Sequence, residues 1–215
     1  MKRREMLANV LSPSKSVKKE DDLRPKKHGA RANYFPNFLL RTHEGKAVRF
    51  YDDLIHGKHV VINMMYADCQ GLCPPITANL VKVQELLKDR IGKDIFMYSI
   101  TLRPEQDTPK ALNEYVKMHH VKPGWTFLTG RPADIDVIRR KLGFVDLDPA
   151  LDKDTKSHIG LLRIGNELTD MWIATPGISK PKNVIKRILW LETPPDYQPE
   201  NGSTQKAKPA SEKKK

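Results

Sequence analysis

The sequence predicts a single α/β domain in which a mixed β-sheet carries helices on both faces. The run from His59 to Met65, HVVINMM, is apolar after its first residue apart from Asn63 and rich in β-branched residues, which is typical of a strand buried on both faces. Strand-like and helix-like runs then alternate along the chain, which is typical of parallel strand pairs joined by helices. A length of 215 residues with 39% hydrophobic residues suffices for one domain plus tails.

The two cysteines of the chain lie where the first predicted strand gives way to a helix. Cys69 falls in the loop at 66–72, and Cys73 directly precedes Pro74 and Pro75, which fit only the first turn of a helix. Unpaired N–H groups and the helix dipole stabilise a thiolate there and lower a thiol pKa from about 8.5. The pair could bind a metal, act in redox chemistry, or do both; two small buried apolar residues are the alternative without chemistry.

The segment before this strand predicts a tail and a hairpin. Residues 1–33 are rich in charge and poor in large apolar side chains, so we expect a disordered basic tail. Residues 37–41 and 47–51 flank the turn-rich piece THEGK, which indicates a β-hairpin ahead of the core.

The segment after the cysteines supplies the remaining elements. The first helix should end near residues 90–92 and be followed by a buried strand at 95–101. Asp107 or Thr108 can cap the next helix, which Pro109 begins. The later elements, in order, are expected as a strand at 125–128, a helix at 134–142, a long acidic loop at 145–157 that leads to His158, strands at 159–164 and 168–174, and a helix at 184–191. This order is a thioredoxin-like arrangement with an N-terminal hairpin extension.

The remaining histidine pairs are weaker candidates for a metal site. His56 and His59 flank Gly57, which favours a surface turn leading into the strand. His119 and His120 are adjacent, so on a helix they point in different directions and make a poor pair of ligands.

The charge distribution argues against nucleic-acid binding. The net charge is +12, but residues 1–33 hold ten Lys or Arg against four acidic residues, and residues 193–215 hold five Lys against three acidic residues. The excess therefore lies mostly in tails and not on a folded face. We expect a basic tail at 1–33, one domain at 34–192 and a second disordered tail at 193–215.

The sequence contains no run of about 18 apolar residues, so no transmembrane segment is predicted. The start, MKRREMLANVL, has paired arginines Arg3 and Arg4 followed by apolar residues, like a twin-arginine export signal. The apolar part stops at SPSKSVKKEDD, which favours a plain basic tail over an export signal.

Four pieces of the chain together resemble the Sco (SCO/SenC) family of thioredoxin-like copper proteins over residues 34–192. They are the stretch VVINMMYADCQGLCPPI, the turn and helix PEQDTPKALNEYV, the strand WTFLTG, and the single His158 after an acidic loop. A CxxxCP motif with one histidine far downstream is a specific combination.

The resemblance implies that Cys69, Cys73 and His158 together bind one copper ion. Thiolates suit Cu(I) and imidazole suits either copper state, so the donor set agrees with this implication. The resemblance also implies a metallochaperone rather than an enzyme, which delivers copper to an apo copper protein of the respiratory chain, such as cytochrome c oxidase, or exchanges it with another copper protein. A periplasmic or otherwise extracytoplasmic location follows from the same resemblance.

Two alternatives use the cysteines without requiring the histidine. A thiol-disulfide oxidoreductase would use Cys69 and Cys73 as its redox pair, and a redox sensor would use the same pair. The chain also departs from the family pattern: Arg103 stands where an aspartate is common, and Ser157 stands where an acidic residue often precedes the histidine. The change at Arg103 bears on how a partner docks, and the change at Ser157 bears on the neighbouring groups that orient His158.

Overall fold

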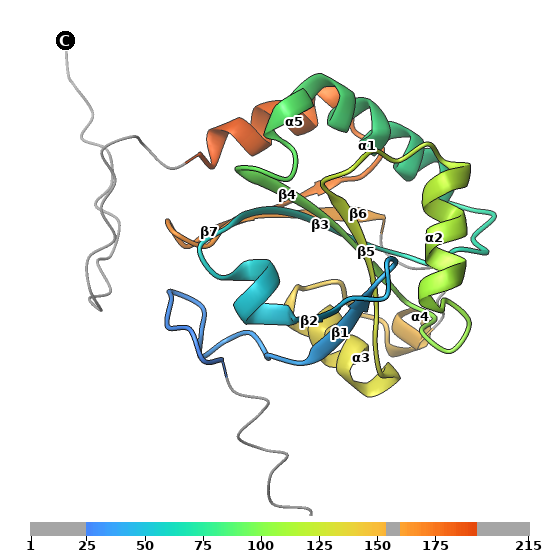
Figure 1. Ribbon diagram of the computed structural model, residues 1–215, viewed down its shortest axis with the longest axis horizontal. Coiled ribbons are helices and arrows are strands. Elements are labelled where there is room, and N and C mark those ends of the chain that lie inside the picture. The colour runs from blue at the N-terminus through green and yellow to red at the C-terminus, as the bar shows by residue number, and fades with distance from the viewer. Residues whose placement is uncertain (1–24, 154–159, 193–215) are drawn as a thin grey trace, which may run out of the picture.

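The computed structural model describes residues 25–153 and 160–192, and within them it contains one seven-stranded sheet (Figure 1). The strand order is β2-β1-β5-β4-β3-β6-β7. The strands are β1 (Leu39–Thr42), β2 (Ala47–Arg49), β3 (His59–Met65), β4 (Ile95–Thr101), β5 (Trp125–Thr129), β6 (Leu161–Asn166) and β7 (Met171–Pro176).

The sheet is mixed, as predicted. The central strands β3, β4 and β5 are parallel, whereas β6 pairs with β3 antiparallel and β7 pairs with β6 antiparallel. The hairpin β1–β2 adds to the other edge by antiparallel pairing with β5. Because β3, β4 and β5 run the same way, their carboxyl ends lie at one edge of the sheet, and the cysteine loop follows the carboxyl end of β3.

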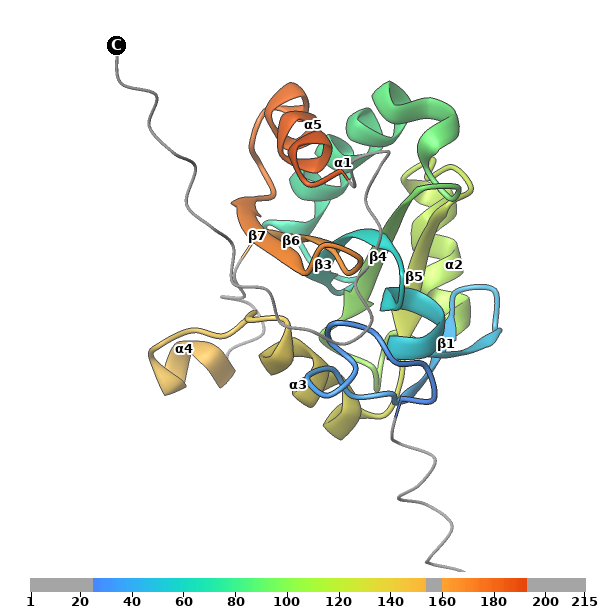
Figure 2. The same ribbon diagram turned by 90° about the vertical axis from the view of Figure 1, so that its left-hand side faces the viewer.

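Helices cover both faces of this sheet (Figures 1 and 2). They are α1 (Cys73–Leu87), α2 (Pro109–Met118), α3 (Pro132–Lys141), α4 (Pro149–Lys153) and α5 (Pro181–Trp190). Each helix has proline in its first turn, where the missing N–H breaks no helical hydrogen bond. Helices α1, α2 and α5 lie on one face, and α3 lies on the other with a π-helix at Phe50–Ile55.

Two cores result from the alternation of side chains along the buried strands. In β3, Val61 and Met65 pack under α1 and α5, while Val60, Ile62 and Met64 pack on the opposite face. A strand with a core on each side needs apolar residues at successive positions, which explains the nearly unbroken apolar run in the sequence.

The fold class and most of the expected elements are confirmed. Strand β4 is present where the sequence predicts it, and β5, α3 and α5 differ from prediction by one to three residues at their ends. The hairpin is present, but its strands cover 39–42 and 47–49 instead of the expected 37–41 and 47–51. Strand β7 begins at Met171, not at residue 168, because Asp170 takes a left-handed conformation (φ 54°) in the preceding turn. Strand β6 begins at Leu161, and the expected start at residue 159 lies outside the described residues.

Two short helices are absent from the prediction. The expected irregular loop at 145–157 contains α4, which Pro149 begins and where the Asp148 carboxylate accepts the Ala150 N–H at 2.8 Å. Tyr51 lies in the π-helix instead of the second hairpin strand, because the Asn37 side chain accepts the N–H groups of Tyr51 and Asp52. A polar side chain from elsewhere in the chain thus replaces a strand partner.

The chain already packs against the domain before residue 34. The N–H groups of Lys26 and Lys27 donate to the Asp52 carboxylate, the Arg31 N–H donates to Glu167, and Ala32 is buried. Residues 1–24 and 193–215 of the two expected tails lie outside the described residues. Within the described ranges, no helix combines the length and the apolar composition that crossing a bilayer requires.

Candidate dithiol and metal site

Cys69 and Cys73 lie side by side at the carboxyl end of β3, as the sequence predicts. Strand β3 ends at Met65, the loop turns where the Cys69 N–H donates to the Tyr66 carbonyl at 3.3 Å, and Cys73 is the first residue of α1. Neither cysteine forms a disulfide, and Cys69 and Cys73 are 6% and 2% exposed, respectively. The arrangement places two sulfur atoms at a helix N-terminus, where N–H groups point toward them.

The surroundings of Cys69 favour its thiolate. Burial raises the pKa of the Cys69 thiol, but hydrogen bonds from the Cys73 side chain, the N–H groups of Cys73 and Gly71, and the Tyr66 hydroxyl outweigh burial and lower that pKa. A sulfur that accepts several hydrogen bonds holds negative charge more easily. Cys69 therefore loses its proton more readily than Cys73, and the thiolate is the form that attacks disulfides and binds metals.

The surroundings of Cys73 favour the protonated thiol. Burial and the hydrogen bond to Cys69 raise the pKa of Cys73, and the Tyr66 N–H, which donates to the Cys73 sulfur, opposes this only partly. Since one thiol donates and the other accepts, the pair shares a proton. Metal binding by both sulfurs releases that proton.

The turn between β4 and α2 contacts the cysteine loop. The carboxylate of Asp107 is buried and accepts the Ala67 N–H at 3.0 Å and the Thr101 hydroxyl. Burial raises the pKa of Asp107, and it outweighs these two hydrogen bonds, which lower that pKa. The sequence interpretation gives Asp107 only a possible capping role, but Thr108 caps α2 by accepting the Ala111 N–H at 3.2 Å. Asp107 is therefore a residue of the site that the sequence analysis missed.

Tyr66 and Arg103 are two further residues of the site. The Tyr66 hydroxyl bonds to the Cys69 sulfur, and burial together with that bond raises the pKa of Tyr66 to about 12. The Arg103 guanidinium carbon lies 3.9 Å from the centroid of the Tyr66 ring. The departure at Arg103 was visible in the sequence, but its contact with Tyr66 depends on the meeting of two separate loops.

His158 lies outside the described residues, so its position relative to the cysteines stays a prediction. The next described residue, Gly160, lies against the start of α1. A side chain at Gly160 would meet Ile76 Cδ1 at 3.1 Å and Leu72 Cδ1 at 3.3 Å. The Gly160 carbonyl accepts the Gly177 N–H at 2.8 Å, which fixes this end of the segment beside the helix that begins at Cys73.

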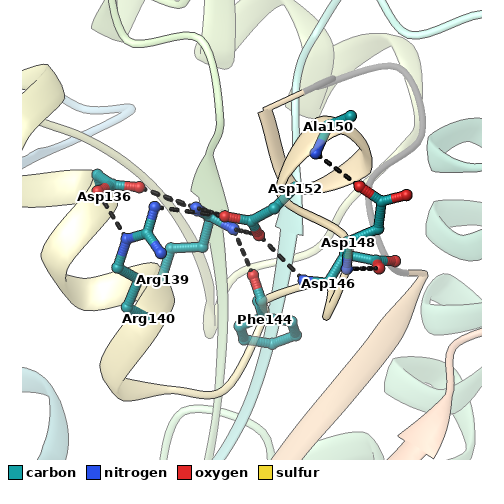
Figure 3. A network of polar contacts seen from close by, with 8 residues as sticks. All are labelled: Asp136, Arg139, Arg140, Phe144, Asp146, Asp148, Ala150 and Asp152. Carbon is teal, nitrogen blue, oxygen red and sulfur yellow. Dashed lines mark hydrogen bonds and ion pairs between the residues drawn. The ribbon is translucent and has the colours of Figure 1, made fainter.

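The other end of the same segment is fixed by ion pairs between α3 and α4 (Figure 3). Arg139 donates to both carboxylate oxygens of Asp152, and Arg140 reaches one of them at 3.3 Å. The side chains of Arg139 and Asp152 are 12% and 8% exposed. The Asp146 N–H and the Phe144 carbonyl complete this network, which we call the α3–α4 clamp.

The other histidines considered from the sequence do not join the cysteines. His59 is buried at the opposite end of β3, where burial lowers its pKa to about 4, and His119 stacks on Tyr115 with ring centroids 4.2 Å apart. His56 contacts the His28 carbonyl at 3.3 Å. Within residues 25–153 and 160–192 no three His, Cys, Asp or Glu side chains gather as a metal site.

The sequence is similar to proteins of the SCO1/SenC family. The model of the SCO1/SenC family matches residues 26–187. The SCO1 homologue of Bacillus subtilis is 29% identical over 94 residues, which are 43% of this chain and 47% of that protein. An SCO2-like protein of Rickettsia prowazekii is 31% identical over 111 residues, 51% of this chain and 52% of that protein. The chain thus spans about half the length of these curated relatives.

Known structures share the fold. A SCO1/SenC family lipoprotein from Bacillus anthracis superposes with a TM-score of 0.60 at 24% identity, over 73% of this chain and 94% of that one. Bradyrhizobium japonicum ScoI with copper bound superposes with a TM-score of 0.57 at 20% identity, over 72% of this chain and 97% of that chain. The family model covers most of the chain and the fold agrees, so the chain belongs to the SCO1/SenC family.

Proposed function

We propose that this protein is a copper-binding metallochaperone whose ligands are Cys69, Cys73 and His158. One copper ion per chain is its cargo, and it passes that ion to an apo copper protein of the respiratory chain, such as cytochrome c oxidase. The main support for the proposal is the pair of thiols, not joined by a disulfide, at the N-terminus of α1.

The donor set fits copper as a cargo. Two thiolates and one imidazole suit Cu(I), while three ligands leave the metal open to an incoming ligand from a partner. The polarised dithiol also fits transfer, since protons that return to the sulfurs help to release the metal.

The position of Gly160 supports His158 as the third ligand. His158 is two residues before Gly160, and two residues of chain span at most about 7 Å. Gly160 lies against Leu72 and Ile76, on either side of Cys73 in the sequence. This position of Gly160 is the support that the described residues give to His158 as the third ligand.

Similar proteins support copper as the cargo and cytochrome c oxidase as the kind of partner. Sco proteins from Bradyrhizobium japonicum and Arabidopsis thaliana have structures with copper bound, and BsSco is described as a member of the Sco family of cytochrome c oxidase assembly proteins. The lipoprotein nature of the Bacillus anthracis relative supports an extracytoplasmic site of action for this chain.

A thiol-disulfide oxidoreductase is the second candidate function. The observation that favours it is the unequal pair of thiols, one with a lowered and one with a raised pKa, which is typical of redox-active cysteines. A disulfide switch has been identified in BsSco. This function needs both cysteines but not His158.

An anaerobic copper titration of the reduced full-length protein separates the two functions. We expect one tightly bound copper per wild-type chain and an affinity lower by about tenfold or more in His158→Ala. His56→Ala is the matched control, because it removes an imidazole just before β3 begins, whereas the cysteines follow the other end of that strand. Equal affinity in wild type and His158→Ala, or no retained copper in either, would leave the dithiol function in place of the chaperone.

A further inference from the structure

Tyr66 touches both sulfur atoms of the dithiol. Its hydroxyl bonds to the Cys69 sulfur, and its backbone N–H donates to the Cys73 sulfur. Its carbonyl accepts the Cys69 N–H at 3.3 Å. Tyr66 is the first residue after β3, whose last residue, Met65, pairs with Thr101 of β4.

Arg103 fixes the ring that carries the hydroxyl. Its guanidinium lies over the Tyr66 ring at 3.9 Å, and the Tyr66 side chain is buried. The Arg103 N–H donates to the Thr101 hydroxyl oxygen at 2.9 Å, and Thr101 bonds in turn to Asp107. A planar guanidinium stacked on an aromatic ring restricts the ring, and arginine does this better than lysine.

We propose that Tyr66 and Arg103 are positioning residues of the dithiol: Tyr66 donates its hydroxyl hydrogen bond to the Cys69 sulfur, Arg103 holds the ring in place, and together they favour the reduced pair. Cys69 lies in the loop and is less buried than Cys73 at the start of α1, so Cys69 is the sulfur that partners meet first. The inference rests on the thiol chemistry of the proposed function and does not depend on copper. Tyr66 stabilises the reduced state because a thiol or thiolate accepts a hydrogen bond more strongly than a disulfide sulfur.

The exchange reaction that these residues would direct is a two-electron transfer with a partner disulfide. The Cys69 thiolate attacks one partner sulfur, the partner S–S bond breaks, and the other partner sulfur leaves as a thiolate and takes up a proton from solvent. Cys73 then loses its proton and attacks the Cys69 sulfur, so the second partner sulfur leaves as a thiol. The partner gains two electrons and two protons, and the Cys69–Cys73 disulfide forms.

The experiment equilibrates metal-free full-length protein with glutathione redox buffers and measures the fraction of disulfide by thiol trapping and mass spectrometry. Tyr66→Phe should shift the equilibrium toward the disulfide by about threefold to tenfold, from the loss of one hydrogen bond. At about 30 mV per tenfold this is a potential more negative by about 15 to 30 mV. Arg103→Ala should shift it in the same direction, and Arg103→Lys should restore wild-type behaviour only partly.

Tyr115→Phe is the matched control. Its hydroxyl is also buried on this side of the sheet but bonds to the Thr77 hydroxyl at 2.8 Å, so its shift should stay below about twofold. A wild-type equilibrium in Tyr66→Phe, or an equal shift in Tyr115→Phe, would overturn the inference. Thermal unfolding of each oxidised and reduced variant separates loss of fold from loss of the hydrogen bond.

Trapping of mixed disulfides tests the second half of the inference. With glutathione disulfide, Cys73→Ser should form a mixed disulfide at Cys69 faster than Cys69→Ser forms one at Cys73, and Tyr66→Phe should narrow that difference. Equal rates in the two serine variants would contradict the inference. Because copper is absent, a failure here leaves the copper titration unaffected.

Discussion

At the scale of single residues, the two cysteines have different chemical tasks although they lie only four positions apart. Cys69 accepts hydrogen bonds from its surroundings, and Cys73 is the more deeply buried and keeps its proton. A single sequence motif thus gives a nucleophilic sulfur and a proton-bearing sulfur, because one sulfur lies in the loop and the other begins the helix.

Alkylation of the reduced protein should therefore modify Cys69 before Cys73. At neutral pH the Cys69 rate should exceed the Cys73 rate, and it should reach its plateau at a lower pH because its pKa is lowered while that of Cys73 is raised. Peptide mapping after brief treatment with iodoacetamide measures both rates. Faster labelling of Cys73 would contradict the assigned hydrogen-bond directions.

Only part of this site could be predicted from the sequence. Cys69 and Cys73 were evident because prolines mark the helix start beside them. Tyr66 and Asp107 were not, since their roles depend on contacts between separate loops: Asp107 reaches the Ala67 N–H across 40 positions of sequence. His158 was found through the family resemblance and stays a prediction.

At the scale of elements, the α3–α4 clamp fixes the chain just before the segment that contains His158. Asp152 of α4 accepts hydrogen bonds from Arg139 and from the Asp146 N–H, and Gly160 is held at the other end of the segment. The sequence predicted an acidic loop here but not α4, because a five-residue helix has too little periodicity to be recognised.

Asp152→Asn should lower the free energy of unfolding by about 1 to 3 kcal/mol at neutral pH. The Arg139 guanidinium holds the pKa of Asp152 well below the usual carboxyl range. The ion pair therefore makes its full contribution to the free energy of unfolding above about pH 4, the ordinary pKa of an aspartate in the unfolded protein. This contribution is lost as the pH falls toward the lower pKa of Asp152 in the folded protein.

Urea unfolding near neutral pH and near pH 3 measures this effect. The difference between wild type and Asp152→Asn should shrink at the lower pH. Asp89→Asn, at an exposed position after α1, is the control and should change stability by less than about 0.5 kcal/mol. A difference that stays constant with pH would argue against the ion pair.

At the scale of the whole molecule, the sheet topology gathers the site. Parallel pairing of β3 with β4 brings the cysteine loop and the turn of Arg103 and Asp107 to one edge, and antiparallel pairing of β6 with β3 brings Gly160 to the same edge. The mixed fold class was predicted from the order of elements. The pairing partners follow from packing across the whole domain and needed the structure.

Copper should stabilise the fold through this site. A ligand that binds only the folded protein at a free concentration of 100 times its Kd adds about 2.7 kcal/mol to the free energy of unfolding. Calorimetry should show a higher midpoint temperature for the copper-loaded wild type and no comparable rise for a Cys69→Ser, Cys73→Ser double variant. An equal rise in both proteins would place copper elsewhere on the chain.

The most direct test of the central claim is X-ray absorption spectroscopy of the Cu(I)-loaded protein, which identifies the atoms bound to copper. We expect two sulfur ligands and one nitrogen ligand in the wild type, and two sulfur ligands without that nitrogen in His158→Ala. A wild-type spectrum with sulfur ligands alone, or a nitrogen ligand that persists in His158→Ala, would contradict the assignment of Cys69, Cys73 and His158 as the copper site.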